Sequence, residues 1–219
     1  MPVKSVGCQK GQLVLAKTDR GARVLLVLVP TMEGLHPTEA YFLLLVLKSL
    51  GSTTIKFVFE AASTNVKSAL EEGDVAVVRD YLLKDYHPTP RVQCPGQSDF
   101  YSFNKLEKQF QDAAREALSE TLGPKKSGHQ NLTLISQIGP FLPSNGNLRF
   151  YKYAGIELYT TASMCVVGTA QRMGMLPLII ARVTNDEFRA SKEPNASELA
   201  KVLLEGLNPV EEDLKKDIF

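Results

Sequence analysis

Cysteine and histidine are scarce in this sequence, which has three of each among its 219 residues. Cys8, Cys94 and Cys165 are widely spaced and form no C-x-x-C pair. The histidines are just as scattered: His36, His87 and His129. A zinc site needs several such ligands close together, and a disulfide framework normally uses an even number of cysteines. We therefore predict reduced thiols, no metal ion and no other bound cofactor, and we expect each histidine at the surface or in a turn.

An excess of either charge is also lacking, because 25 Lys and Arg residues balance 24 Asp and Glu residues. A nearly neutral protein has little electrostatic attraction to nucleic acid or anionic lipid, so neither nucleic acid nor membrane is expected as a partner. No run reaches the roughly 18 apolar residues that a membrane-spanning helix needs, and the first residues lack the apolar core of a signal peptide. These observations predict a cytoplasmic protein.

Several motifs of enzyme chemistry are missing too. Residues 123–128 (GPKKSG) have glycines at P-loop spacing, but His129 and Gln130 stand where Lys and Ser or Thr would hold phosphate and magnesium. The chain contains neither an H-E-x-x-H zinc motif nor a G-x-S-x-G serine elbow. Cys165 lies in the apolar run MCVV, where a small buried side chain is more common than a nucleophile. We place Cys165 in the core.

The chain does have enough apolar sequence for one large domain, since 44% of its residues are hydrophobic. Short apolar runs alternate with helical patterns, which is typical of an α/β protein. We predict a single domain over residues 1–219, with a mixed, mostly parallel twisted sheet, helices on both faces and a helical tail at 196–219. The predicted strands are 11–15, 24–29, 53–59, 75–83, 132–138, 155–158 and 177–183. The predicted helices are 38–50, which is apolar on nearly all sides, 106–118, 147–153 and 161–173.

Three of these strands carry polar or small residues near an end, where ligands often bind. Residues 60–65 (EAASTN) follow the third predicted strand and suggest a loop of small residues. Arg79 and Asp80 near the end of the fourth strand either bind an anion or form a surface ion pair, and the ion pair is the commoner outcome. Asp186 comes soon after the buried run 178–181. Its carboxylate either protrudes into a cleft or caps a following helix.

Four blocks of sequence carry a further signal. They are 43–59 (LLLVLKSLGSTTIKFVF), 73–89 (GDVAVVRDYLLKDYHPT), 135–140 (ISQIGP) and 154–187. In the last block, Gly174 and Arg182 precede Asn185 and Asp186. Together the blocks resemble the nucleoside phosphorylase and nucleosidase superfamily, whose members cleave the N-glycosidic bond of purine or pyrimidine nucleosides. The first block is similar to the helix and strand before the family's phosphate loop, and the last resembles the stretch that ends in its catalytic acid.

The resemblance implies roles for individual residues. Asp186 corresponds to the acid that protonates or hydrogen-bonds purine N7, so that the base leaves neutral as the ribosyl centre gains oxocarbenium character. In the trimeric branch an asparagine of a Thr-Asn pair contacts the base, and Thr184 and Asn185 would supply that pair. The resemblance further implies nucleoside contacts and weaker phosphate contacts, with phosphate as co-substrate. The implied nucleoside contacts are Glu157, Thr160 and Thr161, and the implied phosphate contacts are Ala61, Ser63 and Arg79.

The sequence also departs from the family pattern. Residues 60–64 (EAAST) replace the glycine-rich loop, which adds side chains and a negative charge where backbone amides would cradle phosphate. The Met-Glu pair that holds the ribose is Thr161-Ala162 here, and Glu157 replaces its carboxylate only if the register shifts. The chain begins near what would be the family's second or third strand. That start implies an exposed sheet edge, which a second copy or a larger assembly would cover.

These departures predict a catalytically degenerate nucleoside phosphorylase-like protein that acts as a structural or binding subunit. A nucleoside or nucleobase is the expected small ligand, and a homo-oligomer or a larger assembly is the expected state. The alternative is an active, divergent nucleoside phosphorylase or nucleosidase with Asp186 as general acid. If it uses phosphate, that enzyme is a pentosyltransferase.

Overall fold

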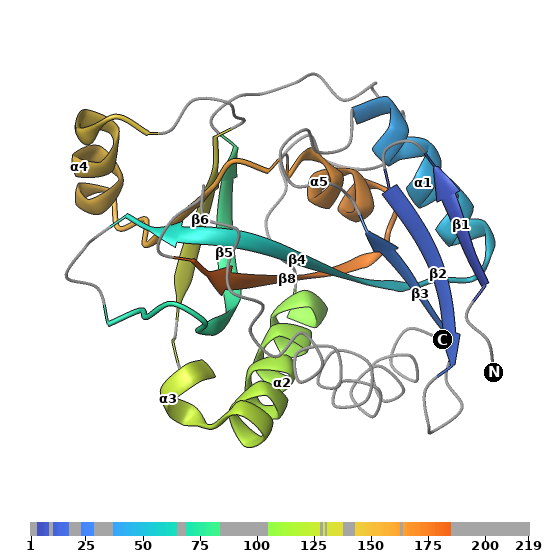
Figure 1. The fold of residues 1–219 in the computed structure, drawn as a ribbon, viewed down its shortest axis with the longest axis horizontal. Helices are drawn as coiled ribbons and strands as arrows, with labels where there is room; N and C mark the ends of the chain where they lie inside the picture. The colour runs from blue at the N-terminus through green and yellow to red at the C-terminus, as the bar shows by residue number, and fades with distance from the viewer. Residues whose placement is uncertain are drawn as a thin grey trace.

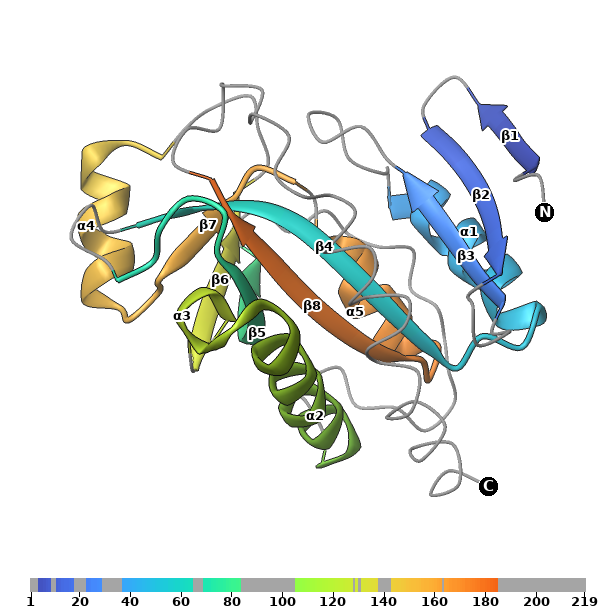
Figure 2. The same ribbon diagram turned by 60° about the horizontal axis from the view of Figure 1, so that its bottom comes forward.

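The computed structural model contains two sheets and five helices in the part of the chain that it describes (Figures 1 and 2). The described residues are 4–8, 11–17, 23–28, 37–64, 69–83, 105–127, 129, 131–137, 143–162 and 164–184. Several subjects of the sequence predictions lie outside these ranges. Among them are His36, His87, the pair Asn185 and Asp186, and the tail at 196–219.

The first three strands form a sheet of their own. β1 (Lys4–Cys8), β2 (Gly11–Lys17) and β3 (Arg23–Leu28) pair in chain order, and both pairings are antiparallel. The predictions of β2 and β3 are confirmed, whereas β1 is not predicted. In both views this sheet lies beside α1 (Pro37–Ser49). It therefore stands apart from the strands that carry the candidate site.

The other five strands close into a barrel in the order β4-β7-β6-β5-β8. They are β4 (Thr54–Ser63), β5 (Val75–Leu83), β6 (Leu132–Ser136), β7 (Leu158–Thr160) and β8 (Leu176–Val183). The pairs β4–β8, β5–β6 and β6–β7 are parallel, and β4–β7 and β5–β8 are antiparallel. The predicted α/β class and mixed sheet are confirmed. Each of these five strands has a neighbour on both sides, but β7 pairs with only the last two residues of β4, so the predicted exposed edge stays a prediction.

The barrel closes because β4 continues beyond its predicted end at Phe59. Residues 54–61 pair in register with 176–183 of β8, and residues 62–63 then pair with 158–159 of β7. The predicted loop at 60–65 is therefore wrong in its first four residues. Alanine has a low β propensity and suggests a loop. In the fold, however, Ala61 is fully buried, and its small side chain fits where three strands converge.

α1 and α5 (Cys165–Arg172) pack together and against the larger of the hydrophobic cores, which contains Leu44 and Ile179. Cys165 is buried, which confirms its predicted place in the core. α1 begins and ends within about one turn of its prediction, but it is not buried on all sides. Phe42 on its outer face is 59% exposed, so the apolar pattern overstates the burial of this helix.

α2 (Lys105–Leu122) covers a second core on the other face of β5 and β8. The sequence pattern predicts Phe110 and Leu118 on the apolar stripe of this helix, and both are fully buried. Ala114, which the pattern does not include, is fully buried as well. α3 (Pro124–Ser127) follows α2, and α4 (Asn145–Tyr153) lies at one end of the molecule in both views. No helix in the described ranges has the length and apolarity that crossing a bilayer requires.

The barrel wall gives a direct test of the fold. Ile179→Ala should lower the free energy of unfolding by about 2–5 kcal/mol, because Ile179 is fully buried in the larger core. Val58→Ala is the matched control on the neighbouring strand, since Val58 is 43% exposed, and it should cost less than about 1 kcal/mol. Urea unfolding followed by circular dichroism measures both. Equal losses for the two variants would contradict the assignment of the two faces.

Candidate functional site

The strand ends that the sequence singles out meet at one end of the barrel. β4 and β8 are parallel to each other, while β7 and β5 run antiparallel to them. The carboxyl ends of β4 and β8 therefore lie beside the amino ends of β5, β6 and β7. We call this region the β4–β8 end. Thr64, Asp74, Glu157 and Thr184 each stand there, immediately before or after their own strand.

Three of the predicted contacts come together at the β4–β8 end. The backbone N–H of Thr184 donates a hydrogen bond to the carbonyl oxygen of Ala61 at 2.8 Å. The Thr184 side chain is buried, and its hydroxyl lies 3.5 Å from the same oxygen. Ser63 is two residues further along β4 and pairs with β7. Asn185 and Asp186 follow Thr184 directly in the sequence, but the structure does not describe them.

Glu60, which stands where the family resemblance leads us to expect a glycine-rich loop, lies opposite the cationic side chain of Arg182. Glu60 and Arg182 are paired across β4 and β8, and their side chains form an ion pair at 3.7 Å. The Glu60 side chain is 47% exposed. Such a surface pair contributes little stability, but it partly offsets the negative charge beside Ala61.

Glu157 is bonded to the barrel through both its side chain and its backbone. Its Oε2 atom accepts a hydrogen bond from the backbone N–H of Thr133 at the start of β6, at 2.8 Å. Its carbonyl oxygen accepts from the N–H of Thr64 at 2.9 Å and lies 3.2 Å from the Thr64 hydroxyl. One carboxylate oxygen of Glu157 therefore accepts a hydrogen bond from β6. Through its backbone and side chain, Glu157 connects the ends of β4, β6 and β7.

Thr160 and Thr161 follow at the other end of β7. The Thr160 hydroxyl is buried and accepts a hydrogen bond from the N–H of Ala162 at 3.2 Å, while the Thr160 carbonyl accepts from the N–H of Gln137. Thr161 is half-buried. Because β7 has only three residues, Glu157 and Thr160 are about 10 Å apart along the chain. Because successive side chains of a strand point to opposite faces, the side chains of Glu157 and Thr160 are on different faces of β7.

Arg79 is not brought to this group. Its Nη1 atom lies 2.9 Å from Oδ1 of Asp112 and donates to Oε1 of Gln111 at 3.3 Å, both on α2. Ala61 instead belongs to the larger core on the other face of the wall. The pairing of β5 with β6 shifts register between Val78 and Asp80, so Arg79 has no partner residue in this ladder. The predicted surface ion pair of Arg79 is confirmed, but its partner is Asp112 rather than Asp80.

The sequence does not reveal a histidine–carboxylate pair at the same end. Nε2 of His129 lies 2.9 Å from Oδ2 of Asp74, which also accepts a hydrogen bond from the N–H of Glu71. The backbone of Asp74 accepts from the N–H of Val183, one residue before Thr184. His129 is predicted at the surface or in a turn; it lies between α3 and β6, and its side chain is 16% exposed. The Gly-Asp turn before β5 is the only sequence signal near this pair.

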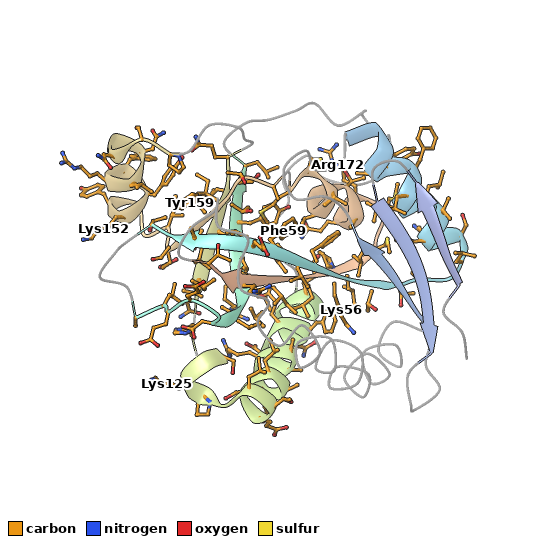
Figure 3. All side chains as sticks on the ribbon, in the orientation of Figure 1. Lys56, Phe59, Lys125, Lys152, Tyr159 and Arg172 are labelled. Carbon is orange, nitrogen blue, oxygen red and sulfur yellow. The ribbon has the colours of Figure 1, made fainter. Side chains whose placement is uncertain are left out.

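Tyr159 is a further residue that sequence reasoning does not single out. Its neighbours on β7 face the larger core, whereas its own side chain packs with Ile135, Leu148, Tyr151 and Ile156 on the side of α4. Figure 3 shows Tyr159 between α4 and the barrel. In the described ranges, no three His, Cys, Asp or Glu residues are grouped closely enough to hold a metal ion. Besides backbone groups and hydroxyls, the described part of the site therefore contains the Glu157 carboxylate and two charged or chargeable pairs, Glu60 with Arg182 and Asp74 with His129.

Comparison with known proteins gives structural matches only. A scan against models of protein families finds no match, and a search of curated proteins finds none either. The fold is similar to a Schistosoma purine nucleoside phosphorylase in complex with guanosine, with a TM-score of 0.66, 18% identity, and coverage of 89% of this chain and 79% of that one. It is also similar to a purine nucleoside phosphorylase with ribose-1-phosphate, with a TM-score of 0.69, 17% identity, and coverage of 96% and 78%. A methylthioadenosine phosphorylase from Schistosoma mansoni with adenine matches with a TM-score of 0.64, 20% identity, and coverage of 97% and 85%.

The hydrogen bond from Thr133 to Glu157 tests what the carboxylate does. Glu157→Ala should lower the free energy of unfolding by about 1–3 kcal/mol, because it leaves the Thr133 N–H without its acceptor. Glu157→Gln keeps a side-chain oxygen and should cost less than Glu157→Ala. Urea unfolding of the two variants measures the difference. If both leave stability unchanged, Glu157 is not needed to join β6 and β7.

Proposed function

We propose that this chain, which has a nucleoside phosphorylase-like fold, is a catalytically degenerate nucleoside phosphorylase-like protein that acts as a structural or binding subunit. One observation carries the proposal: polar groups that the resemblance assigns to sugar and phosphate are already bonded within the fold. Glu157 accepts from β6, Thr160 accepts from the loop after β7, and Arg79 pairs with α2. A ligand would have to compete with these bonds, and the cost of breaking one is about 1–3 kcal/mol if a buried partner is left unpaired.

The phosphate position supports the same proposal. A phosphate cradle needs several backbone N–H groups that converge on one point. Ala61 and Ser63 instead lie in a paired strand, where successive N–H groups point towards opposite neighbours. Without bound phosphate the chain has no phosphate nucleophile for phosphorolysis. The loss therefore affects the reaction more than it affects recognition of a base.

We also propose that the small molecule bound by this chain is a nucleoside or a nucleobase. The similar structures contain guanosine in one case and hypoxanthine in another. In this chain the junction of β4, β7 and β8 brings Ala61 and Ser63 beside β7 and Thr184. A thermal shift with inosine or adenosine at millimolar concentration distinguishes a binding subunit, whose melting temperature rises, from a purely structural one.

The second candidate is an active, divergent phosphorylase or nucleosidase with Asp186 as general acid. It is favoured by one specific contact, the hydrogen bond that fixes Thr184 against Ala61. Asn185 and Asp186 come directly after Thr184, so they are one and two residues along the chain from the junction of β4, β7 and β8. In this candidate a neighbouring subunit supplies the missing sugar carboxylate and phosphate ligands.

The proposal predicts that the purified protein releases no free base. Inosine, guanosine, adenosine, methylthioadenosine and uridine are each incubated with the protein, with and without phosphate, and free base is measured by chromatography. Release should not exceed that of a protein-free control, because the sugar and phosphate ligands are engaged elsewhere.

Asp186→Asn separates the two candidates if base release is seen. Turnover that this substitution abolishes, and that Asp80→Asn leaves intact, would support the active enzyme and contradict the degenerate one. Asp80 is a suitable control because it is exposed and lies outside the junction. Turnover that survives Asp186→Asn would reject Asp186 as the general acid.

A further inference from the structure

The outward half of α4 has an unusual composition for a solvent-exposed helix surface. Arg149, Phe150, Lys152 and Tyr153 are all exposed, and the two aromatic side chains are 63% and 93% exposed. At 3.6 residues per turn these four positions occupy one continuous arc of about 160°. Tyr153 lies within it, one turn from both Arg149 and Phe150. We call these four residues the α4 outer face.

The fold does not need these side chains to hold α4 in place. The helix is attached by its opposite half, where Tyr151 is buried against Ile135 and Ile156. The Tyr151 hydroxyl also donates a hydrogen bond to Oε1 of Gln137 at 2.7 Å. At the amino end, the Ser144 side chain accepts from the N–H of Asn147 and caps the helix. Of the α4 outer face, Phe150 makes a T-shaped ring contact with Tyr151 within the helix, with ring centroids 6.2 Å apart, and it still remains 63% exposed.

We propose that the α4 outer face is a docking surface for an acidic segment of another protein. Exposed aromatic residues together with arginine are enriched at the energetic centres of protein interfaces. α4 carries two cationic side chains and no acidic residue in its nine positions. An approaching segment with carboxylates next to apolar side chains would thus meet complementary charges around two aromatic rings.

An acidic protein segment fits better than the other anionic partners. The whole chain has a net charge of +1, which gives it little of the extended positive field that nucleic acid binding uses. Two cations on a helix of nine residues would supply only about 2 kcal/mol of attraction to an anionic membrane. Figure 3 shows Lys152 at the outer end of the molecule with α4, where a partner can approach without displacing another described element.

A photo-crosslinker at the centre of this face tests the proposal. The full chain with Tyr153→p-benzoylphenylalanine is expressed in its native cells and irradiated, and the crosslinked peptide is mapped by mass spectrometry. The expected result is one protein, joined through a segment of net negative charge. Arg149→Glu with Lys152→Glu should lower the crosslinked yield by about tenfold, because two attractive pairs become repulsive. Lysine substitutions at the mapped acidic residues should restore the yield.

The matched control is Lys108→Glu with Lys125→Glu, which changes the net charge equally on exposed positions of α2 and α3. It should leave the yield unchanged. A crosslink to nucleic acid, to lipid, to a second copy of this chain or to a segment without net negative charge would overturn the proposal. So would the absence of any crosslink, or equal losses in the control. The proposal does not depend on the proposed function, because base release and crosslinking are measured separately.

Discussion

The structure depends on the junction where the last residues of β4 pair with both β8 and β7. Alanines at positions 61 and 62 make this possible, since both are buried and neither carries a side chain that would hold three strands apart. The junction closes the barrel and sets Thr184 against Ala61. Two further hydrogen bonds connect the remaining strands. The N–H of Val183 in β8 donates to the carbonyl of Asp74 before β5, and the N–H of Thr133 in β6 donates to the carboxylate of Glu157 before β7. A larger side chain at Ala61 would disturb all of these contacts together.

The sequence predicts those helices and strands whose formation depends mainly on neighbouring residues in the chain. β5 is predicted over the same residues that the structure shows, 75–83, because a Val-rich run follows a turn in which Gly73 has a φ of +90°. The amphipathic pattern of α2 likewise identifies its buried face. The end of β4 is missed because small residues are ambiguous, and only contacts with distant strands decide between strand and loop. β7 is misplaced because three residues carry too little pattern.

The candidate site also contains features that the sequence predicts and features that it does not. The strand end at Thr184 follows from the buried run before it, and the nearby positions of Ala61 and Ser63 follow from the family resemblance. The contact between Arg79 and Asp112 joins residues 33 positions apart, and the contact between His129 and Asp74 joins residues 55 positions apart. No periodic pattern in the sequence predicts either of these two contacts. Glu157, Thr160 and Arg79 look available for a ligand in the sequence, but each is bonded to another part of the same fold.

Closure of the barrel has a consequence for how an extended peptide can associate with this protein. Strand addition requires a strand with an unpaired side, and each of the five barrel strands has a neighbour on both sides for at least part of its length. In the described part of the chain, only β1 and β3 border a sheet on one side. Among the described strands, β1 and β3 of the N-terminal sheet are therefore the ones that are open to a partner strand along their whole length. Figures 1 and 2 show this sheet at the opposite end of the molecule from α4, so a peptide that pairs with it extends the fold away from that end.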